Sequence, residues 1–291
     1  MPSFRSFRFA PLFLALAACS APSSNEQAPV AAAADPAPAP ASEPAPAPAF
    51  DWAGILGGEQ RTEAERARDP YRHPAETLAF FGVEPGKTVV EITPGGGWYT
   101  AVIAPLLNES GQYIGAVRDE SLPGQPPYVA KGNAAIEKRF ADFPGMFGKA
   151  KLVRFDPAAP VFGEAASADV VLTFRNAHNW IGDGNPEAYF KGFFEVLKPG
   201  GTLGIVDHRT VGDATDGKSG YVTEQQIIDL AVAAGFAFVD KSEINANPKD
   251  GRNHPKGVWT LPPTFALGDE DREKYADIGE SDRMTLKFVK P

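Results

Sequence analysis

The fold is decided by residues 89–100, which read Val-Val-Glu-Ile-Thr-Pro-Gly-Gly-Gly-Trp-Tyr-Thr. The β-branched residues on either side of Glu91 predict a buried parallel strand. The glycines that follow predict a tight turn, because glycine reaches positive φ without a steric cost. An amphipathic helix is then predicted to begin at Trp98, with free N–H groups and the positive end of its dipole in the first turn. A strand, a tight turn and a helix N-terminus in this order form the ligand-binding corner of a doubly wound α/β fold.

The spacing within this corner narrows the class of ligand. A dinucleotide-binding turn would have its third glycine where the chain has Thr100, so an NAD-dependent oxidoreductase is the weaker interpretation. No Gly-Lys-Ser/Thr follows the glycines, which excludes a phosphate-binding P-loop. The remaining pattern, from Glu91 to Gly97, resembles motif I of the class I S-adenosylmethionine (SAM)-dependent methyltransferases. Thr93 stands where that family usually has glycine, and Pro94, with φ fixed at about −65°, offers another way to shape the turn.

Further segments resemble this family in the order that its fold requires. Residues 197–201, Leu-Lys-Pro-Gly-Gly, stand between a predicted helix over 186–196 and a predicted strand over 202–206. They match the turn that precedes strand five of the family. Residues 168–174 resemble its strand four, and residues 151–156 resemble its strand three.

The end of the chain completes the resemblance. Residues 282–289 alternate as a final edge strand does, so the similarity extends from Thr88 to the C-terminus. It implies a doubly wound, Rossmann-like, mostly parallel seven-stranded sheet whose last strand is antiparallel. Residues 68–74, Arg-Asp-Pro-Tyr-Arg-His-Pro, resemble a segment of poorly characterised, exported bacterial methyltransferase-like proteins, lipoproteins among them.

Residues 1–18 have the features of a bacterial signal peptide. Arg5 and Arg8 form a charged n-region, and the apolar run over 9–18 is too short to span a bilayer. The sequence Leu-Ala-Ala-Cys that ends at Cys19 resembles a lipobox, which predicts lipidation of Cys19 after cleavage; cleavage at an Ala-x-Ala site is the alternative. Ser20 is typical of sorting to the outer membrane, so we expect a lipid-anchored protein on its periplasmic face.

The amino-acid composition divides the chain after the signal peptide into a tether and a folded domain. Residues 19–50 are rich in alanine and proline and predict a disordered, extended tether, whereas residues 51–291 predict one methyltransferase-like domain. The net charge of −9 and the lack of a basic stripe exclude nucleic acid as the partner. Cys19 is the only cysteine, which excludes disulfides and thiolate metal sites.

The resemblance implies which residues contact SAM: Glu91, Gly95, Gly96, Gly97, Asp119 and Asp156. Glu91 would orient the glycine turn or reach the methionine part of SAM. The acid that binds the ribose hydroxyls normally stands about twenty residues beyond the glycines, at Val117 here, so Asp119 or Glu120 would replace it. Asp156 would meet the adenine amino group, or it is an ordinary turn residue.

Polar and aromatic residues follow predicted strand four, at positions 175–180. The carboxyl ends of parallel strands face the ligand in this fold class. We expect His178 to act as a general base, because imidazole titrates near neutral pH. Asn176 would position the substrate and Trp180 would stack on it. The alternative for His178 is a buried structural histidine.

The segment before the first strand commonly caps the pocket in this family. Arg72 and His73 would therefore reach the substrate, or an Asp–Arg ion pair would pin the cap. Residues 247–263 predict an insertion that forms either a substrate lid or a hairpin.

A metal site is a further possibility at the end of strand five. Asp207 and His208, together with His178 and His73, form the only plausible set of metal ligands. Some methyltransferases of this family hold a divalent ion with acids and an asparagine, to which Asn176 and Asp207 would correspond. The acid expected after strand four is absent, so we expect no metal.

These observations favour an exported SAM-dependent methyltransferase acting on a small or envelope-associated acceptor, with no nucleic-acid partner. SAM is made in the cytosol, whereas the leader predicts export. The alternative is therefore a non-catalytic binding protein of the cell envelope with the methyltransferase fold. Neither the acceptor nor the oligomeric state follows from the sequence.

Overall fold

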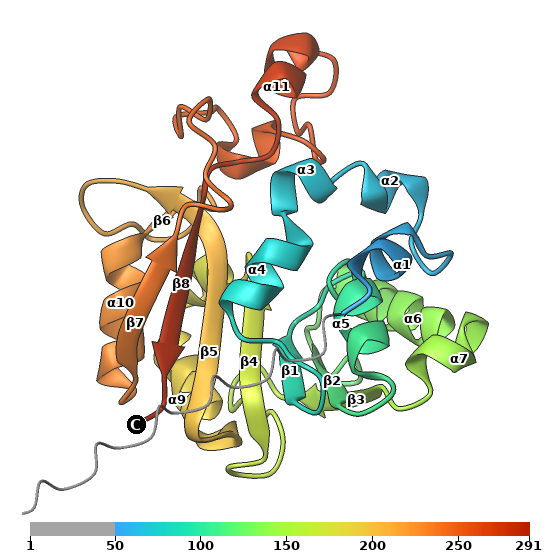
Figure 1. Ribbon diagram of the computed structural model, residues 1–291. Coiled ribbons are helices and arrows are strands. Elements are labelled where there is room, and N and C mark those ends of the chain that lie inside the picture. The colour runs from blue at the N-terminus through green and yellow to red at the C-terminus, as the bar shows by residue number, and fades with distance from the viewer. Residues whose placement is uncertain (1–49) are drawn as a thin grey trace, which may run out of the picture. The chain divides into compact units, whose positions relative to one another are not determined.

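The computed structural model describes residues 50–291. The predictions made for the signal peptide over 1–18, for lipidation of Cys19 and for the tether up to residue 49 lie outside these residues. Residues 50–291 form one sheet with helices on both faces (Figure 1). The predicted α/β fold class is therefore confirmed.

Seven strands of the described residues lie in the spatial order β3-β2-β1-β4-β5-β8-β7. They are β1 (Thr88–Ile92), β2 (Gln112–Arg118), β3 (Lys151–Phe155), β4 (Ala168–Phe174), β5 (Leu197–Thr210), β7 (Ala237–Ser242) and β8 (Arg283–Val289). Strands β1 to β5 pair in parallel, whereas β8 is antiparallel to both β5 and β7, as predicted. The short β6 (Val222–Thr223) pairs with the end of β5 and adds an eighth strand to the seven expected.

Alternate side chains of the central strands face two apolar layers. Val90 of β1 and Val171 of β4 pack into one layer, and their neighbours Val89 and Leu172 pack into the other. Successive side chains of a strand point to opposite faces, so a strand covered on both sides is apolar almost throughout. This explains why the strand sequences read as continuous apolar runs.

Helices supply the other half of each layer. One layer contains α9 (Pro186–Val196) and α10 (Glu224–Ala233), and the other contains α4 (Pro74–Phe80) and α5 (Thr100–Leu107). The remaining helices are α1 (Trp52–Gly57), α2 (Glu63–Arg66), α3 (Asp69–Arg72), α6 (Pro127–Asp142), α7 (Pro144–Phe147), α8 (Ala177–Gly182), the 3₁₀ helix η1 (Gly257–Thr260) and α11 (Arg272–Ile278). No helix within residues 50–291 is both long enough and apolar enough to cross a membrane.

The boundaries predicted for α9 and β4 are confirmed, and two others differ for tertiary reasons. The helix expected at Trp98 begins at Thr100, because the Trp98 indole is held in the turn, where its N–H donates to the Glu65 carbonyl at 2.9 Å. Strand β5 already begins at Leu197, which pairs with Ala168 of β4.

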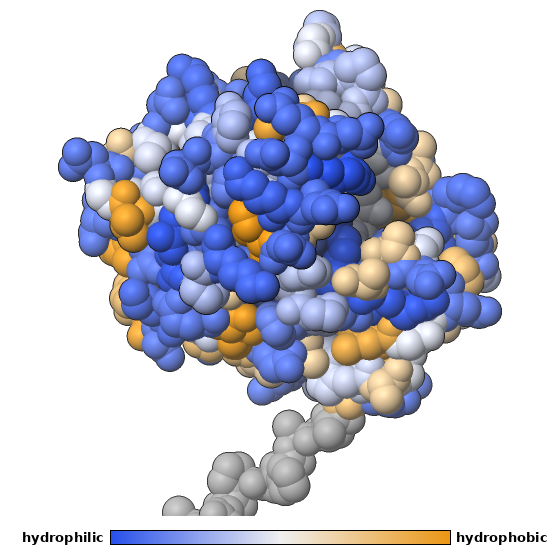
Figure 2. All heavy atoms as spheres, turned by 90° about the horizontal axis from the view of Figure 1, so that it is seen from above, coloured by the Kyte–Doolittle hydropathy of each residue, from blue (hydrophilic) through white to orange (hydrophobic). Residues whose placement is uncertain are grey.

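The carboxyl ends of the parallel strands point upward in Figure 1, where α2, α3 and the segment before β8 gather. Figure 2 looks onto this end of the described domain, and it shows mostly hydrophilic residues with apolar ones in separate small patches. The candidate ligand sites at this end are therefore cavities between elements and not a broad apolar surface.

Candidate functional site

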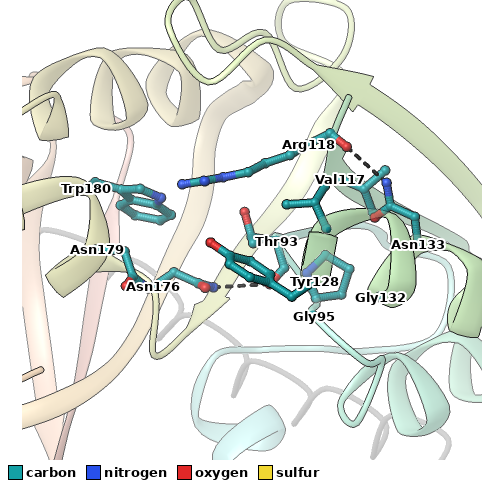
Figure 3. A pocket seen from close by; sticks show the side chains of 12 residues that line it. Thr93, Gly95, Val117, Arg118, Tyr128, Gly132, Asn133, Asn176, Asn179 and Trp180 are labelled. Atoms are coloured by element: carbon teal, nitrogen blue, oxygen red, sulfur yellow. Dashed lines mark hydrogen bonds between the residues drawn. The ribbon is translucent and has the colours of Figure 1, made fainter. Parts of the chain in front are cut away.

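A cavity of about 160 Å³ lies where the strand order reverses, beside the ends of β1 and β4 (Figure 3). Its walls come from residues 93–95 after β1, residues 117–118 at the end of β2, the first turns of α6, and Asn176, Asn179 and Trp180 around the start of α8. Ligands of open α/β sheets bind in this crevice. We refer to it as the switch-point cavity.

The glycine turn after β1 contributes Gly95 to the wall of this cavity and packs closely against α6. Gly95 and Gly97 have φ values of 62° and 79°, which favour glycine. A Cβ on Gly97 would lie 3.1 Å from Ile136 of α6, and a Cβ on Gly132 of α6 would lie 2.9 Å from the Gly95 carbonyl oxygen. Of the three predicted cofactor glycines, Gly95 lines the cavity, whereas Gly96 and Gly97 do not. Packing of α6 therefore accounts for the glycine at position 97 without a ligand.

Glu91 does not line the cavity either. Its buried carboxylate accepts hydrogen bonds from the Tyr113 hydroxyl at 2.6 Å and from the Thr100 hydroxyl at 2.9 Å. Burial raises the pKa of Glu91 to about 7, although these two hydrogen bonds oppose the rise. Because Thr100 is the first residue of α5, Glu91 holds the start of that helix. These contacts lie on α5 and β2 and not on the glycine turn that Glu91 was expected to orient, and the expected contact with the methionine part of SAM stays a prediction.

Neither acid assigned to the nucleoside of SAM lines the cavity. The Asp119 carboxylate accepts hydrogen bonds from the backbone N–H and the hydroxyl of Ser121, at 2.9 and 2.6 Å. These hydrogen bonds hold the pKa of Asp119 below its usual value. Asp156 is exposed and accepts a hydrogen bond from the Ala158 N–H at 2.8 Å, as a turn residue does. The structure therefore engages both acids in local turns.

Other residues line the cavity at the end of β2. Arg118 reaches across it toward Trp180, and Tyr128 of α6 stands at its edge with 65% of its surface exposed (Figure 3). Glu120, the other acid considered for the ribose, does not line the cavity, and its carboxylate accepts hydrogen bonds from Arg154 of β3 and from the Asn133 amide. Sequence reasoning missed Arg118, although its place at the carboxyl end of a predicted strand was a usable signal.

Asn176 and Trp180 do line the switch-point cavity. The Asn176 amide donates hydrogen bonds to the carbonyls of Ile92 and Thr93, at 3.1 and 3.3 Å, and so ties the end of β4 to the turn after β1. Trp180 is 1% exposed and stacks on Tyr189 with ring centroids 4.3 Å apart, which leaves only part of the indole facing the cavity. Both residues help to build the wall in addition to any contact with a ligand.

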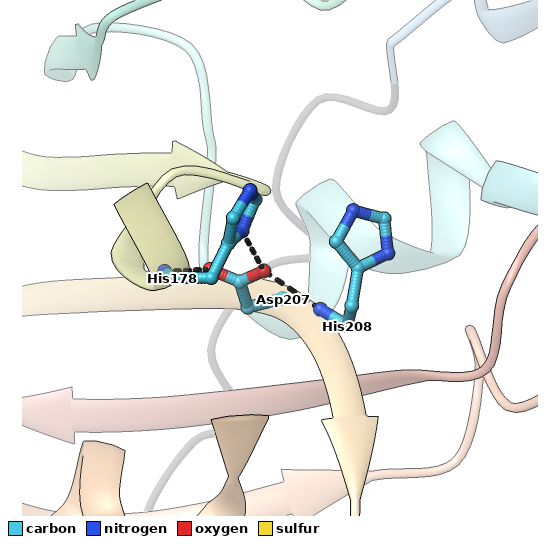
Figure 4. Close-up of side chains that lie close together, drawn as sticks. All are labelled: His178, Asp207 and His208. Carbon is cyan, nitrogen blue, oxygen red and sulfur yellow. Dashed lines mark hydrogen bonds and ion pairs between the residues drawn. The ribbon is translucent and has the colours of Figure 1, made fainter. Parts of the chain in front are cut away.

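His178 lies on α8 and faces β5 instead of the switch-point cavity (Figure 4). Its Nδ1 is 2.9 Å from Oδ1 of Asp207, which is completely buried. The Asp207 carboxylate also accepts the backbone N–H groups of His178 and His208, at 3.2 and 2.7 Å. An Nδ1–H that donates to a carboxylate leaves the lone pair on Nε2. Asp207 thus fixes the orientation of the His178 ring, a contact that the sequence did not predict.

Within residues 50–291, His178, Asp207 and His208 are the group whose possible ligand atoms lie close enough to hold a metal, within 4.8 Å of one another. His73, the fourth ligand considered in the sequence, is not among them. Both Asp207 oxygens already accept hydrogen bonds, and the His208 Nδ1 is hydrogen-bonded to the Ser281 hydroxyl. These contacts favour a hydrogen-bonded pair over a metal centre, and the expectation of no metal stays a prediction.

A second cavity, of about 70 Å³, lies beside the ends of β4 and β5. Its polar walls are Arg175, His208, Glu280 and Ser281, and residues 258–264 close it with apolar and aromatic side chains. Burial, followed by the charges of His178 and Arg175, lowers the pKa of His208 well below its usual value, so His208 is neutral at pH 7. We refer to this space as the Arg175 cavity.

Arg72 and His73 lie away from the switch-point cavity. Arg72 is 1% exposed; its Nε donates to Glu280 at 3.2 Å, and its guanidinium lies over the Trp98 ring. His73 joins α3 to α4 with φ of 41° and lines a separate cavity beside Tyr71. Arg72 thus forms a buried ion pair with Glu280, while the Asp–Arg pair expected at this cap forms between Asp69 and Arg61.

No family model matches this sequence, and no curated protein matches it. Solved structures do resemble it: a SAM-dependent methyltransferase from Aquifex aeolicus matches with a TM-score of 0.53 and 15% identity over 77% of this chain and 93% of the other. The [4+2]-cyclase SpnF matches with a TM-score of 0.55 and 15% identity, over 80% of this chain and 85% of the other. A putative sarcosine dimethylglycine methyltransferase from Galdieria sulphuraria matches with a TM-score of 0.52 and 15% identity, over 80% of this chain and 88% of the other. Because SpnF is described as a cyclase, likeness in fold does not by itself specify methyl transfer. What these matches show is the fold: residues 50–291 have the fold of the class I SAM-dependent methyltransferases.

Proposed function

We propose that this protein is a SAM-dependent methyltransferase that acts on a small or envelope-associated acceptor. The observation that carries the proposal is the switch-point cavity, which adjoins the segment that carries His178, the partner of Asp207. Cavities at this position bind nucleotide-like ligands in doubly wound folds.

The lining residues fit SAM in chemical type. Val117 and Val129 offer apolar surface for a base, and Arg118 and Asn179 offer polar groups for hydroxyls or a carboxylate. The Thr93 hydroxyl is buried and has no hydrogen-bond partner among the described residues, so it is available to a ligand. At about 160 Å³ the cavity is smaller than typical ligand pockets, which measure roughly 300–1,000 Å³. A bound SAM molecule would therefore extend past Tyr128 into solvent.

The chain's own contribution to the reaction would be orientation and proton removal. When bound, SAM supplies a methyl group on a positively charged sulfur. Holding the acceptor in line with that carbon would provide most of the acceleration. His178 Nε2 would take the proton from an acceptor hydroxyl or ammonium group, and Asp207 would stabilise the resulting imidazolium.

A specific observation favours the alternative, a non-catalytic binding protein. Neither of the acids that would hold the ribose, Asp119 and Glu120, lines the cavity, and Oδ1 of Asp119 accepts hydrogen bonds from Ser121. Export would also separate the domain from cytosolic SAM. The proposed envelope location depends on the signal-peptide pattern and on Cys19 in the sequence.

Calorimetry with SAM and S-adenosylhomocysteine tests the proposal. The purified protein should bind both, and Arg118→Met should weaken binding by about tenfold, the effect of losing one charge-assisted contact. The matched control Arg272→Met removes an exposed arginine of α11, outside the cavity, and should leave binding unchanged. Failure of the unmodified protein to bind either ligand would overturn the proposal. Binding without transfer of labelled methyl groups to envelope extracts would favour the alternative.

A further inference from the structure

Four arginines gather around one buried carboxylate at the carboxyl end of the sheet. Glu280 is 4% exposed and accepts hydrogen bonds from Arg68 at 2.6 Å, from Arg72 at 3.2 Å and from Arg283 at 2.9 Å. Arg175 lines a cavity that Glu280 also lines. We refer to these four arginines and Glu280 as the arginine cluster.

The cluster has an excess of positive charge. Burial opposes ionisation of Glu280, yet Arg283, Arg72, Arg68 and Arg175 together lower its pKa to about 2. One carboxylate neutralises only one of the four guanidinium groups. Arg72 and Arg283 are buried, whereas Arg68 and Arg175 are partly buried. Uncompensated charge in such surroundings is costly, so the cluster favours the binding of an anion.

Unused donors point to the same conclusion. Within residues 50–291, buried nitrogens of all four arginines lack a hydrogen-bond partner: Arg68 Nη2, Arg72 Nη2, Arg175 Nε and Arg283 Nε. Buried polar atoms in folded proteins are nearly always paired, with protein, water or ligand. Arg72 and Arg283 are 1% and 3% exposed, so bulk solvent does not serve them.

Arg175 is the member that faces a cavity without any partner. Its side chain makes no ion pair within 4.0 Å with a described residue, and burial lowers its pKa to about 10, which keeps it charged at neutral pH. Its φ of 62° is uncommon for a residue other than glycine. Strained backbone of this kind concentrates at functional sites.

We propose that the Arg175 cavity binds the carboxylate of an organic acid, which would be the acceptor of the proposed methyl transfer. The identification with the acceptor rests on the proposed function; the anion site itself does not. A guanidinium fork matches a carboxylate in two parallel hydrogen bonds. The cavity of about 70 Å³ has room for a planar carboxylate group, whose single charge Arg175 would balance.

The other walls of the Arg175 cavity indicate which chemical groups the rest of the acid would carry. Val258, Trp259, Pro262 and Pro263 surround the cavity, and Trp259 is 38% exposed. An acid with an apolar or aromatic body would pack against these side chains. The His178 ring lies 6.1 Å from the Trp259 ring, so such a body would lie beside the proposed base.

Calorimetry with benzoate, acetate and inorganic phosphate as probes tests this inference on the purified protein. Benzoate should bind one site per chain and more tightly than acetate, and Arg175→Met should weaken benzoate at least tenfold. Arg154→Met is the matched control and should change nothing. Trp259→Ala should weaken benzoate more than acetate, because it removes only the apolar wall.

Thermal unfolding without ligand separates recognition from a structural role. Arg175→Met removes an unpaired cation, so its melting temperature should equal or exceed that of the unmodified protein. A lower melting temperature together with unchanged benzoate affinity would overturn the proposal, as would phosphate binding more tightly than benzoate. A parallel titration with SAM distinguishes failure of this proposal from failure of the proposed function. If the protein binds SAM but not benzoate, only the anion site is refuted. If it binds benzoate but not SAM, only the proposed function is refuted.

Discussion

Replacing Glu91 with glutamine tests whether a buried carboxyl group holds the start of α5. Burial raises the pKa of Glu91 from 4.5 to about 7, against hydrogen bonds from Tyr113 and Thr100 that lower it. The side chain is 2% exposed, so solvent screening does little to reduce the effect. At about 1.4 kcal/mol per pKa unit, the rise corresponds to about 3 kcal/mol of unfolding free energy.

The sign follows from proton linkage. The folded state keeps the Glu91 proton to a higher pH than the unfolded state, so this stabilisation is complete below pH 4.5 and is lost as the pH rises through about 7. Between these limits the unfolding free energy of the unmodified protein should fall by about 3 kcal/mol relative to Glu91→Gln. Urea unfolding at several pH values, followed by circular dichroism, measures this difference.

A second variant sharpens the test. Tyr113→Phe removes a hydrogen bond that favours the ionised carboxylate, so the pH at which stability is lost should move upward. If the unmodified protein and Glu91→Gln give parallel curves of stability against pH, the reasoning about Glu91 is wrong.

Three further changes test other parts of the molecule. His178→Ala should lower methyl transfer by roughly 10²–10⁴-fold with SAM affinity unchanged, and a variant that only melts earlier while keeping its specific activity would return His178 to a structural role. Gly132→Ala should destabilise the protein by about 1–3 kcal/mol, because its Cβ would lie 2.9 Å from the Gly95 carbonyl oxygen; Gly145→Ala, in open space, is the control in urea unfolding. Cys19→Ser should release the protein from the membrane fraction, and continued membrane association without a retained signal peptide would contradict lipidation.

Two neighbouring residues after the end of β4 each line a different one of the two cavities. Asn176 lines the switch-point cavity and Arg175 lines the other. His178, two residues beyond Asn176, turns toward Asp207 on β5. A short segment thus places a cofactor-side wall, an anion contact and an oriented base within four residues of one another along the chain. In the proposed reaction this proximity would align acceptor and base.

The sequence by itself determined the class of fold and much of the sheet. The strand–glycine turn–helix corner after Glu91, the apolar run of β4 and the Pro-Gly-Gly turn before the core of β5 are local signals. Each depends on side-chain alternation or on the allowed backbone angles of a few residues, so each can be interpreted without knowing its neighbours in space. The place of Asn176 and Trp180 beside the switch-point cavity followed from the rule that ligands face the carboxyl ends of strands.

Only the tertiary structure decided which side chains serve a cavity and which serve their neighbours. Asp119 and Asp156 stand near the expected positions in the sequence, yet nearby backbone N–H groups take up their carboxylates. Glu280 meets Arg68 from a segment 212 residues away, a contact that no local pattern encodes. The Arg175 cavity arises in the same way, because its charge and its unpaired donors are properties of side chains that only folding brings together.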